Sequence, residues 1–248
     1  MWKIIHELGS WNGEEEDMTF KADLEREVKE IFRSTWAIRE SRDVPVPGGL
    51  SPGNDAAKLH ATVLYADMAD STKLVDGHQH DFAAEVYKTY LRCAATIIKS
   101  EQGVITAYDG DRVMAVFLGD LKNDAAVRSA MKIHYTVQQI INPALKGHYR
   151  KKRYRLNHVV GIDTSELFVT RIGVRNDPDL VWVGRAANYA AKLCSINGNY
   201  SIYITRAVFI SLSDDTKYDG KELMWKKEAW KTRNNMSIYG SSYQWPIT

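Results

Sequence analysis

The chain has 248 residues, of which 44% are hydrophobic and 26% charged, as in soluble globular proteins. Its formal net charge of +2 is too small to indicate a nucleic-acid or anionic-membrane partner, and we interpret the basic run at residues 148–155 as a solvated loop, with a nucleic-acid surface as the minor alternative. No apolar run approaches the ~20 residues of a membrane-spanning helix, and the N-terminus lacks the apolar core of a signal peptide. Cys93 and Cys194 lie in apolar helical patterns, which indicates buried thiols, no disulfide framework and a cytoplasmic location.

Residues 1–57 are predicted to form a helix followed by a loop. Residues 1–18 are polar and acidic, and we expect them to be poorly ordered. From Phe20 to about Arg39, apolar side chains recur at helical spacing, which predicts an amphipathic helix that covers a domain face or a partner subunit. Prolines and glycines crowd residues 41–58, so we expect a loop there.

Strand and helix patterns alternate over residues 58–248. We predict strands at about 61–68, 104–108, 112–117, 156–162, 166–172, 180–183, 201–204, 224–230 and 236–243, and helices at about 79–100, 123–145, 185–196 and 206–212. The Asp109-Gly110 pair predicts a tight hairpin, and polar residues 163–165 predict a second one. The order βαββαβ, with further strands at the C-terminus, predicts an α+β domain whose helices cover one face of a mainly antiparallel sheet.

Two aspartates lie at the ends of strands that this order places side by side. Asp67 ends the first of these strands, and Asp111 follows the hairpin turn. Two carboxylates that converge repel each other, and a divalent cation relieves the repulsion. Asp70 or Asp109 could replace one of them, although Asp109 is better suited to form the turn.

A third pattern places an amide and a cation on one face of a predicted helix. Asn188 and Lys192 are four residues apart, just after Gly184, and could hold a ribose and a phosphate oxygen. An ordinary amphipathic helix whose alanines pack inward explains the same pattern.

Together, these stretches resemble the three signatures of class III nucleotide cyclases. The matching runs are residues 65–72 (YADMADST), 110–117 (GDRVMAVF) and 184–193 (GRAANYAAKL), in the family's order within about residues 58–205. The resemblance implies a ferredoxin-like α+β catalytic domain at residues 58–248. It also implies a homodimer with active sites at the subunit interface, a nucleoside triphosphate substrate, and two Mg²⁺ or Mn²⁺ ions per site.

The resemblance also assigns roles to single residues. Asp67, Asp111 and the backbone of Met68 match the metal ligands, and Asn188 matches the asparagine that orients the ribose and the transition state. Lys192 stands where the family has a phosphate-binding arginine, so it keeps the charge but loses the bidentate geometry. The segment that receives the triphosphate corresponds to Ala69, Asp70, Ser71 and Thr72.

The base-reading positions depart from those of purine cyclases. Ala107 stands where adenylate cyclases carry lysine and guanylate cyclases usually glutamate, and Val181 replaces the second purine reader. Tyr65, Arg112 and Trp182 are placed to contact the base instead. This combination resembles the pyrimidine cyclases of bacterial Pycsar antiphage systems, whose cyclic UMP or cyclic CMP signals to a separate effector protein.

The resemblance therefore implies metal-dependent cyclisation of a pyrimidine nucleoside triphosphate. UTP is favoured over CTP, because uracil offers two carbonyl groups to the donors of Tyr65 and Arg112. We expect no nucleic-acid partner and no membrane insertion. Two alternatives stay open: an adenylate or guanylate cyclase with an unusual base pocket, and a catalytically inactive nucleotide-binding module.

Overall fold

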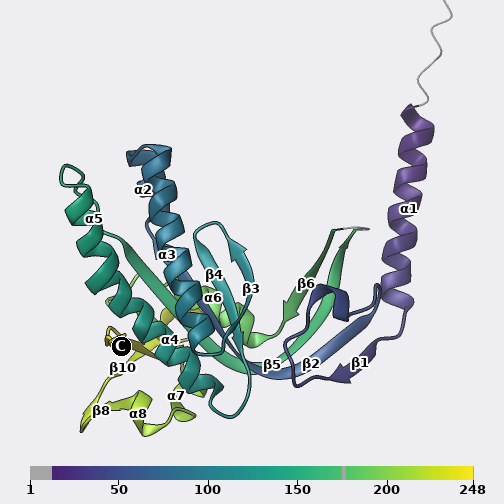
Figure 1. The fold of residues 1–248 in the computed structure, drawn as a ribbon. Helices are drawn as coiled ribbons and strands as arrows, with labels where there is room; N and C mark the ends of the chain where they lie inside the picture. Colours follow the sequence, from purple (N-terminus) through teal and green to yellow (C-terminus); the bar gives the residue numbers. More distant parts are fainter. Residues whose placement is uncertain (1–12, 175–176, 248) are drawn as a thin grey trace, which may run out of the picture.

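A computed structural model describes residues 13–174 and 177–247 (Figure 1). Its helices are α1 (Gly13–Arg33), α2 (Ser71–Gly77), α3 (His80–Ser100), α4 (Lys122–Thr136), α5 (Asn142–His148), α6 (Arg185–Cys194), α7 (Arg206–Ile210) and α8 (Asp214–Lys217). Its strands are β1 (Ala37–Glu40), β2 (Asp55–Ala69), β3 (Val104–Asp109), β4 (Arg112–Phe117), β5 (Asn157–Val174), β6 (Asp177–Val183), β7 (Ile202–Thr205), β8 (Tyr218–Asp219), β9 (Glu222–Leu223), β10 (Lys226–Trp230) and β11 (Met236–Ser241).

Within the described residues, nine strands form one mixed sheet, which confirms the predicted α+β class. The strand order is β10-β11-β7-β5-β2-β4-β3, with β1 added to β2 and β6 added to β5. The β5–β7 and β1–β2 pairs are parallel, and the other pairs in the sheet are antiparallel.

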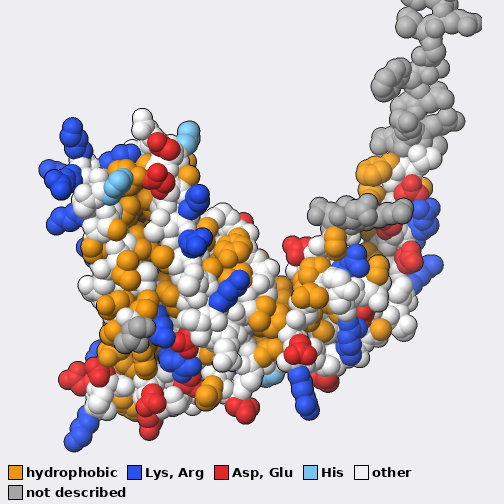
Figure 2. Space-filling view, viewed as in Figure 1, with side chains coloured by type: hydrophobic (Ala, Val, Ile, Leu, Met, Phe, Trp, Pro, Cys, Tyr) orange, Lys and Arg blue, Asp and Glu red, His pale blue; other side chains and the backbone are white. Residues whose placement is uncertain are grey.

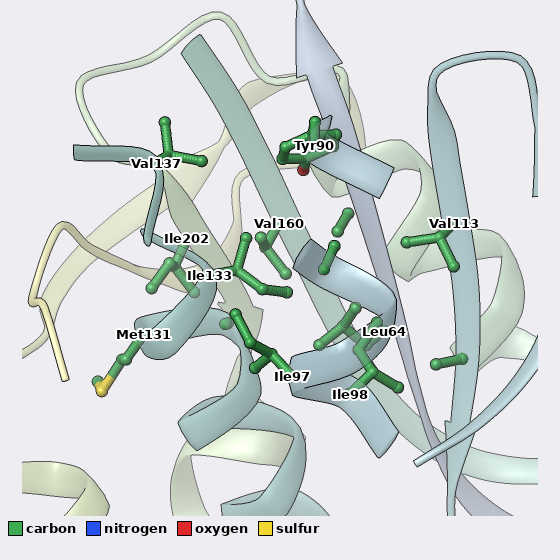
Figure 3. Packing of buried hydrophobic residues seen from close by; sticks show 14 of the residues in the cluster. Leu64, Tyr90, Ile97, Ile98, Val113, Met131, Ile133, Val137, Val160 and Ile202 are labelled. Atoms are coloured by element: carbon green, nitrogen blue, oxygen red, sulfur yellow. The ribbon is translucent and has the colours of Figure 1, made fainter. Parts of the chain in front are cut away.

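Helices cover both faces of the central strands, whereas the sequence predicted one covered face. Leu64, Ala66 and Met68 of β2 are buried in the cluster that α3 and α4 build (Figure 3). Successive strand residues point to opposite faces, so Val63 belongs to a second cluster, in which the alanines of α6 pack against β2 and β5. None of the helices in the described part of the chain has the length and apolar character needed to cross a bilayer.

The predicted hairpin at Asp109-Gly110 is confirmed, since β3 and β4 pair across this turn and Gly110 has a φ of 60°. The predicted turn at residues 163–165 is wrong. Asp163 lies in the middle of β5, which continues for 18 residues and makes its hairpin with β6 instead.

The N-terminal prediction is partly wrong. Helix α1 begins at Gly13, inside the segment that we expected to be poorly ordered, and residues 1–12 lie outside the described part of the chain. The helix ends at Arg33 instead of Arg39, because residues 37–40 form β1 and pair with β2.

The molecule has two parts, which Figure 1 shows side by side. The body contains α2 to α8 and the strands that they cover. The arm consists of β1, β6, residues 55–60 of β2 and residues 166–174 of β5, and α1 projects from it. A hollow separates the helices of the body from the arm, and hydrophobic side chains gather along it (Figure 2).

Candidate active site

Strands β2 and β4 bring Asp67 and Asp111 to one end of the body. Asp67 pairs in register with Arg112 on β4, and the amide of Met68 donates to the backbone oxygen of Asp111 over 3.4 Å. Burial raises the pKa of Asp67 to about 6, and the negative charge of Asp111 adds to the shift while Arg112 opposes it. The two carboxylates therefore form an electronegative pair at the end of a buried strand.

This carboxylate pair could hold a divalent cation whose remaining ligands are not protein side chains. In residues 13–174 and 177–247, no three His, Cys, Asp or Glu side chains lie close enough together to hold a metal. Mg²⁺ usually takes one or two protein carboxylates and completes its shell with water and substrate phosphates. Burial and, to a smaller degree, the charge of Asp111 raise the pKa of Asp67, and a bound cation would favour its ionised form.

The chain reverses its direction directly after this strand. Asp70 adopts a left-handed conformation with a φ of 59°, and α2 begins at the next residue. Its carboxylate forms an exposed ion pair with Lys73 of α2 (2.6 Å). Ala69 is thus the last residue of β2, and Ser71 and Thr72 are the first two residues of α2, on either side of this turn.

Tyr65 and Arg112 lie beside the same carboxylates. Tyr65 is two residues before Asp67 on β2, so both side chains point to the same face. Burial raises the pKa of Tyr65, which keeps its hydroxyl protonated near neutral pH. Arg112 donates from Nη2 and Nε to Asp109 over 2.7 and 3.1 Å, which fixes its guanidinium near Asp67.

Helix α6 carries Asn188 and Lys192 on its exposed side. Its inner side lies so close to β5 that a Cβ on Gly161 would lie 2.1 Å from the backbone oxygen of Ala190. At its last residue, the thiol of Cys194 contacts the backbone oxygen of Tyr65 over 3.3 Å. The helix is thus fixed against β2, the strand that carries Asp67, while its polar face remains exposed to solvent.

The structure does not bring every candidate together within one chain. Asp67 lies opposite Val159 on β5, whereas Trp182 lies opposite Val169. Ten residues of extended strand span about 33 Å, so Trp182 is in the arm and far from Tyr65 and Arg112. In the described residues, no ion pair joins Lys192 to Asp67 or Asp111.

Sequence reasoning missed a buried carboxylate that holds α6 in place. Asp163 is fully buried, accepts from Thr205, and pairs with Arg185 at the start of α6 (3.0 Å). The backbone amide of Ala186 also donates to Ser165 Oγ (2.9 Å). An acidic residue within an apolar strand pattern was the available signal, but we interpreted it as a turn.

Two cations near Lys192 were also missed. Lys192 borders a cavity of about 790 Å³ that Trp230, Lys231 and Arg233 also line. The guanidinium of Arg233 lies 5.5 Å from the ring centroid of Tyr189 and 5.9 Å from that of Trp230. Because Lys231 and Arg233 lie some 40 residues after Lys192, spacing along the sequence could not associate them with it.

Known proteins resemble this chain over nearly its whole length. A curated uridylate cyclase of Xanthomonas perforans is 48% identical over 93% of this chain and all of its own length. One from Burkholderia cepacia is 46% identical over the same shares, and one from a Rhodovulum strain is 34% identical over 91% of this chain and 97% of its own. None of the protein-family models matches.

Solved structures show the same fold at low sequence identity. The guanylyl cyclase Cya2 has a TM-score of 0.63 and 18% identity, covering 76% of this chain and 94% of its own. The adenylyl cyclase CyaB from P. aeruginosa has a TM-score of 0.61 and 19% identity, covering 75% and 95%. The chain therefore belongs to the uridylate cyclase family and has the catalytic fold of class III nucleotidyl cyclases.

Proposed function

We propose that this protein converts UTP to 3′,5′-cyclic UMP and pyrophosphate in the cytoplasm. The observation that carries the proposal is the meeting of Asp67 and Asp111 at the end of β2, in a chain 48% identical to a curated uridylate cyclase. In the reaction, the ribose 3′ oxygen bonds to the α-phosphorus and the bond from that phosphorus to the bridging oxygen breaks. Pyrophosphate leaves with the bridging oxygen, and the hydroxyl proton passes to solvent.

The residues at the end of β2 would position the triphosphate. Mg²⁺ or Mn²⁺ ions held by Asp67, Asp111 and the backbone of Met68 would lower the pKa of the 3′-hydroxyl and neutralise phosphate charge. The backbone from Ala69 to Thr72 would receive the β- and γ-phosphates.

We further propose that each site forms between two copies of the chain. Asn188 would orient the ribose and Lys192 would neutralise charge that develops on the α-phosphate, both from the partner subunit. The exposed polar face of α6 supports this, as does the distance along β5 between Trp182 and the carboxylate pair. A homodimer with two-fold symmetry would contain two equivalent sites.

Uracil is the proposed base because the pocket offers hydrogen-bond donors. The hydroxyl of Tyr65 and the guanidinium of Arg112 could each donate to a carbonyl of uracil, whereas cytosine has only one carbonyl. Neither Ala107 nor Val181 can bond a purine edge with its side chain. A mismatched polar edge leaves buried groups unpaired, at about 1–3 kcal/mol for each group.

Competition between equal concentrations of UTP, CTP, ATP and GTP with Mn²⁺ tests the proposal, with products identified by mass spectrometry. Cyclic UMP should dominate. Dominant cyclic CMP would overturn the choice of uracil alone, and dominant cyclic AMP or cyclic GMP would favour the purine-cyclase alternative. The absence of any cyclic product would favour an inactive nucleotide-binding module.

The proposed biological role is antiphage signalling through a separate effector protein, which the resemblance to pyrimidine cyclases suggests. Bacteria that carry the cyclase together with the gene of its effector should resist phage. Cells with Asp67→Asn in the cyclase should be as sensitive as cells without the system. Plaque counts measure the difference, and equal protection by the variant would exclude cyclic-nucleotide signalling as the cause.

A further inference from the structure

Helix α1 exposes an apolar stripe that no other helix or strand covers within residues 13–174 and 177–247. The stripe consists of Phe20, Leu24, Val28, Ile31 and Phe32, whose exposed fractions are 63, 47, 49, 55 and 82%. Their spacing places them along one side of the helix. Such a stripe normally supplies most of the stability of a helix by packing against another element.

Hydrogen bonds anchor the C-terminal end of α1 to the loop before β2. The side chain of Asn54 donates to the backbone oxygens of Ile31 (2.9 Å) and Ser34 (2.7 Å). Among the described helices and strands, none packs along α1, which projects from the arm in Figure 1. The helix is therefore anchored at one end, and its stripe is available to another molecule.

We infer that a second copy of this chain covers the α1 stripe, so that α1 forms part of the dimer interface. This inference rests on the proposed shared active site. In the proposed shared site, the partner's carboxylate pair must reach Trp182 of β6, so the partner must pack against the arm, from which α1 projects (Figure 1). Ile38, Ile172 and Val183 of the arm are also about half exposed, and the strand register places them on the face of the arm opposite to Trp182, so the arm exposes apolar side chains on that face as well.

The area of the α1 stripe suits a protein partner of this kind, and the charge of α1 disfavours an anionic membrane. The five side chains expose roughly 500 Å², and two copies related by symmetry would bury roughly 1,000 Å², which is near the lower limit for a specific interface. Residues 13–33 contain eight acidic and four basic side chains, a net charge of −4. Helices that bind anionic membranes are rich in Lys and Arg instead, so a lipid surface is the less suitable occupant.

The test compares two double variants of the full-length protein with the same change in charge. Leu24→Glu with Ile31→Glu alters the stripe, whereas Ala22→Glu with Lys29→Gln alters the polar side of α1. The dimer dissociation constant is measured by analytical ultracentrifugation, cyclic UMP formation is measured over a range of protein concentrations, and circular dichroism checks folding. We expect the stripe variant to raise the dissociation constant by about thirtyfold or more and the control to leave it unchanged.

The stripe variant should also lose activity per chain at low protein concentration and recover it at high concentration. A stripe variant that dimerises like the wild type would overturn the inference, while cyclic UMP formation by the wild type would leave the proposed function intact. Binding of α1 to anionic vesicles, lost in the stripe variant without a change in dimerisation, would also overturn it. A stripe variant that is monomeric yet fully active at every concentration would support the interface and overturn the shared active site.

Discussion

The two ends of β2 are stabilised in different ways. In the body, Leu64 and Val63 are fully buried, one under α3 and α4 and the other under α6. In the arm, the same strand buries Ala57 and Leu59 and adds a polar clamp, in which Asp55 accepts from Arg39 (2.6 Å) and from the amide of Ser51 (2.6 Å). The Ser51 hydrogen bond is the largest of the effects that hold the pKa of Asp55 below its usual value.

The difference fits the proposal that a partner subunit covers part of the arm and α1. The body buries its apolar side chains within one chain, whereas the arm and α1 leave large hydrophobic side chains exposed on a thin layer. Large exposed apolar surfaces usually mark sites of interaction. The four predictions below test this division, starting with the largest expected effect.

Asp67→Asn and Asp111→Asn should each abolish turnover without unfolding the body. Each substitution removes a carboxylate from the proposed metal site and leaves the buried apolar residues unchanged, so we expect a loss of about a thousandfold or more. Cyclic UMP formation with Mn²⁺ measures activity, and circular dichroism measures folding. Asp76→Asn on the exposed side of α2 is the control and should keep wild-type activity; a near-wild-type rate for either test variant would refute the metal assignment.

Two inactive chains should restore activity when they are mixed. A chain with Asp67→Asn and a chain with Lys192→Ala can form one intact site in each heterodimer. Random pairing makes half of the dimers heterodimers, with one of two sites intact, so about a quarter of wild-type activity should return. Differently tagged chains, purified together through both tags, verify heterodimer formation; inactive heterodimers would indicate that each site lies within one chain.

Acid should destabilise the body through a buried pair of histidines. Burial is the main cause that lowers the pKa of His158 to about 3 and of His134 to about 4. In the unfolded chain both titrate near 6.5, so the unfolded state binds more protons below that pH. The two histidines therefore cost no stability above about pH 6.5. As the pH falls from there toward the folded-state pKa values, the free energy of unfolding decreases.

This loss should reach about 2–4 kcal/mol at pH 5 for the pair together. Urea unfolding at pH 5 to 8 measures it. His134→Leu with His158→Met should flatten the profile between pH 6.5 and 5, whereas His60→Gln with His80→Gln on the surface should not. An unchanged slope in the buried variant would show that other groups cause the acid sensitivity.

The smallest predicted effect is a gain of stability from Asp67→Asn without metal. The pKa of Asp67 is raised to about 6, so the cost of its buried charge is absent below about pH 4 and complete above about pH 6. Removing this charge should stabilise the metal-free protein at pH 7.5 by about 1–2 kcal/mol, after allowance for partial exposure. Thermal unfolding measures the gain, and Mn²⁺ should raise the Tm of the wild type more than that of the variant; a variant less stable than the wild type would contradict this account.

Sequence patterns predicted the elements that depend on local chemistry. The prediction of a turn at Asp109-Gly110 was correct, because a glycine with positive φ and the flanking apolar runs specify a tight hairpin locally. The alternating strand and helix patterns predicted the strand order, and the strand order in turn predicted that Asp67 and Asp111 lie close together.

The errors arose where distant residues decide the structure. The polar run at residues 163–165 resembles a turn, but Arg185 and Thr205 satisfy Asp163 inside β5, and both are far away in the sequence. Residues 37–40 continue the helical spacing of α1, yet pairing with β2 makes them a strand. The separation of Trp182 from Tyr65 depends on the register of β6 on β5, which spacing along the chain does not reveal.

The close contact between Gly161 and α6 has a consequence for genetics. A single methyl group there would meet the backbone oxygen of Ala190 at 2.1 Å, so Gly161→Ala must push the helix outward together with Asn188 and Lys192. If sites are shared as proposed, the displaced residues belong to the site whose carboxylates come from the other chain. Such an allele would therefore be recessive and not dominant negative, because the mutant chain that damages one site of a mixed dimer also supplies intact carboxylates to the other site, which stays complete.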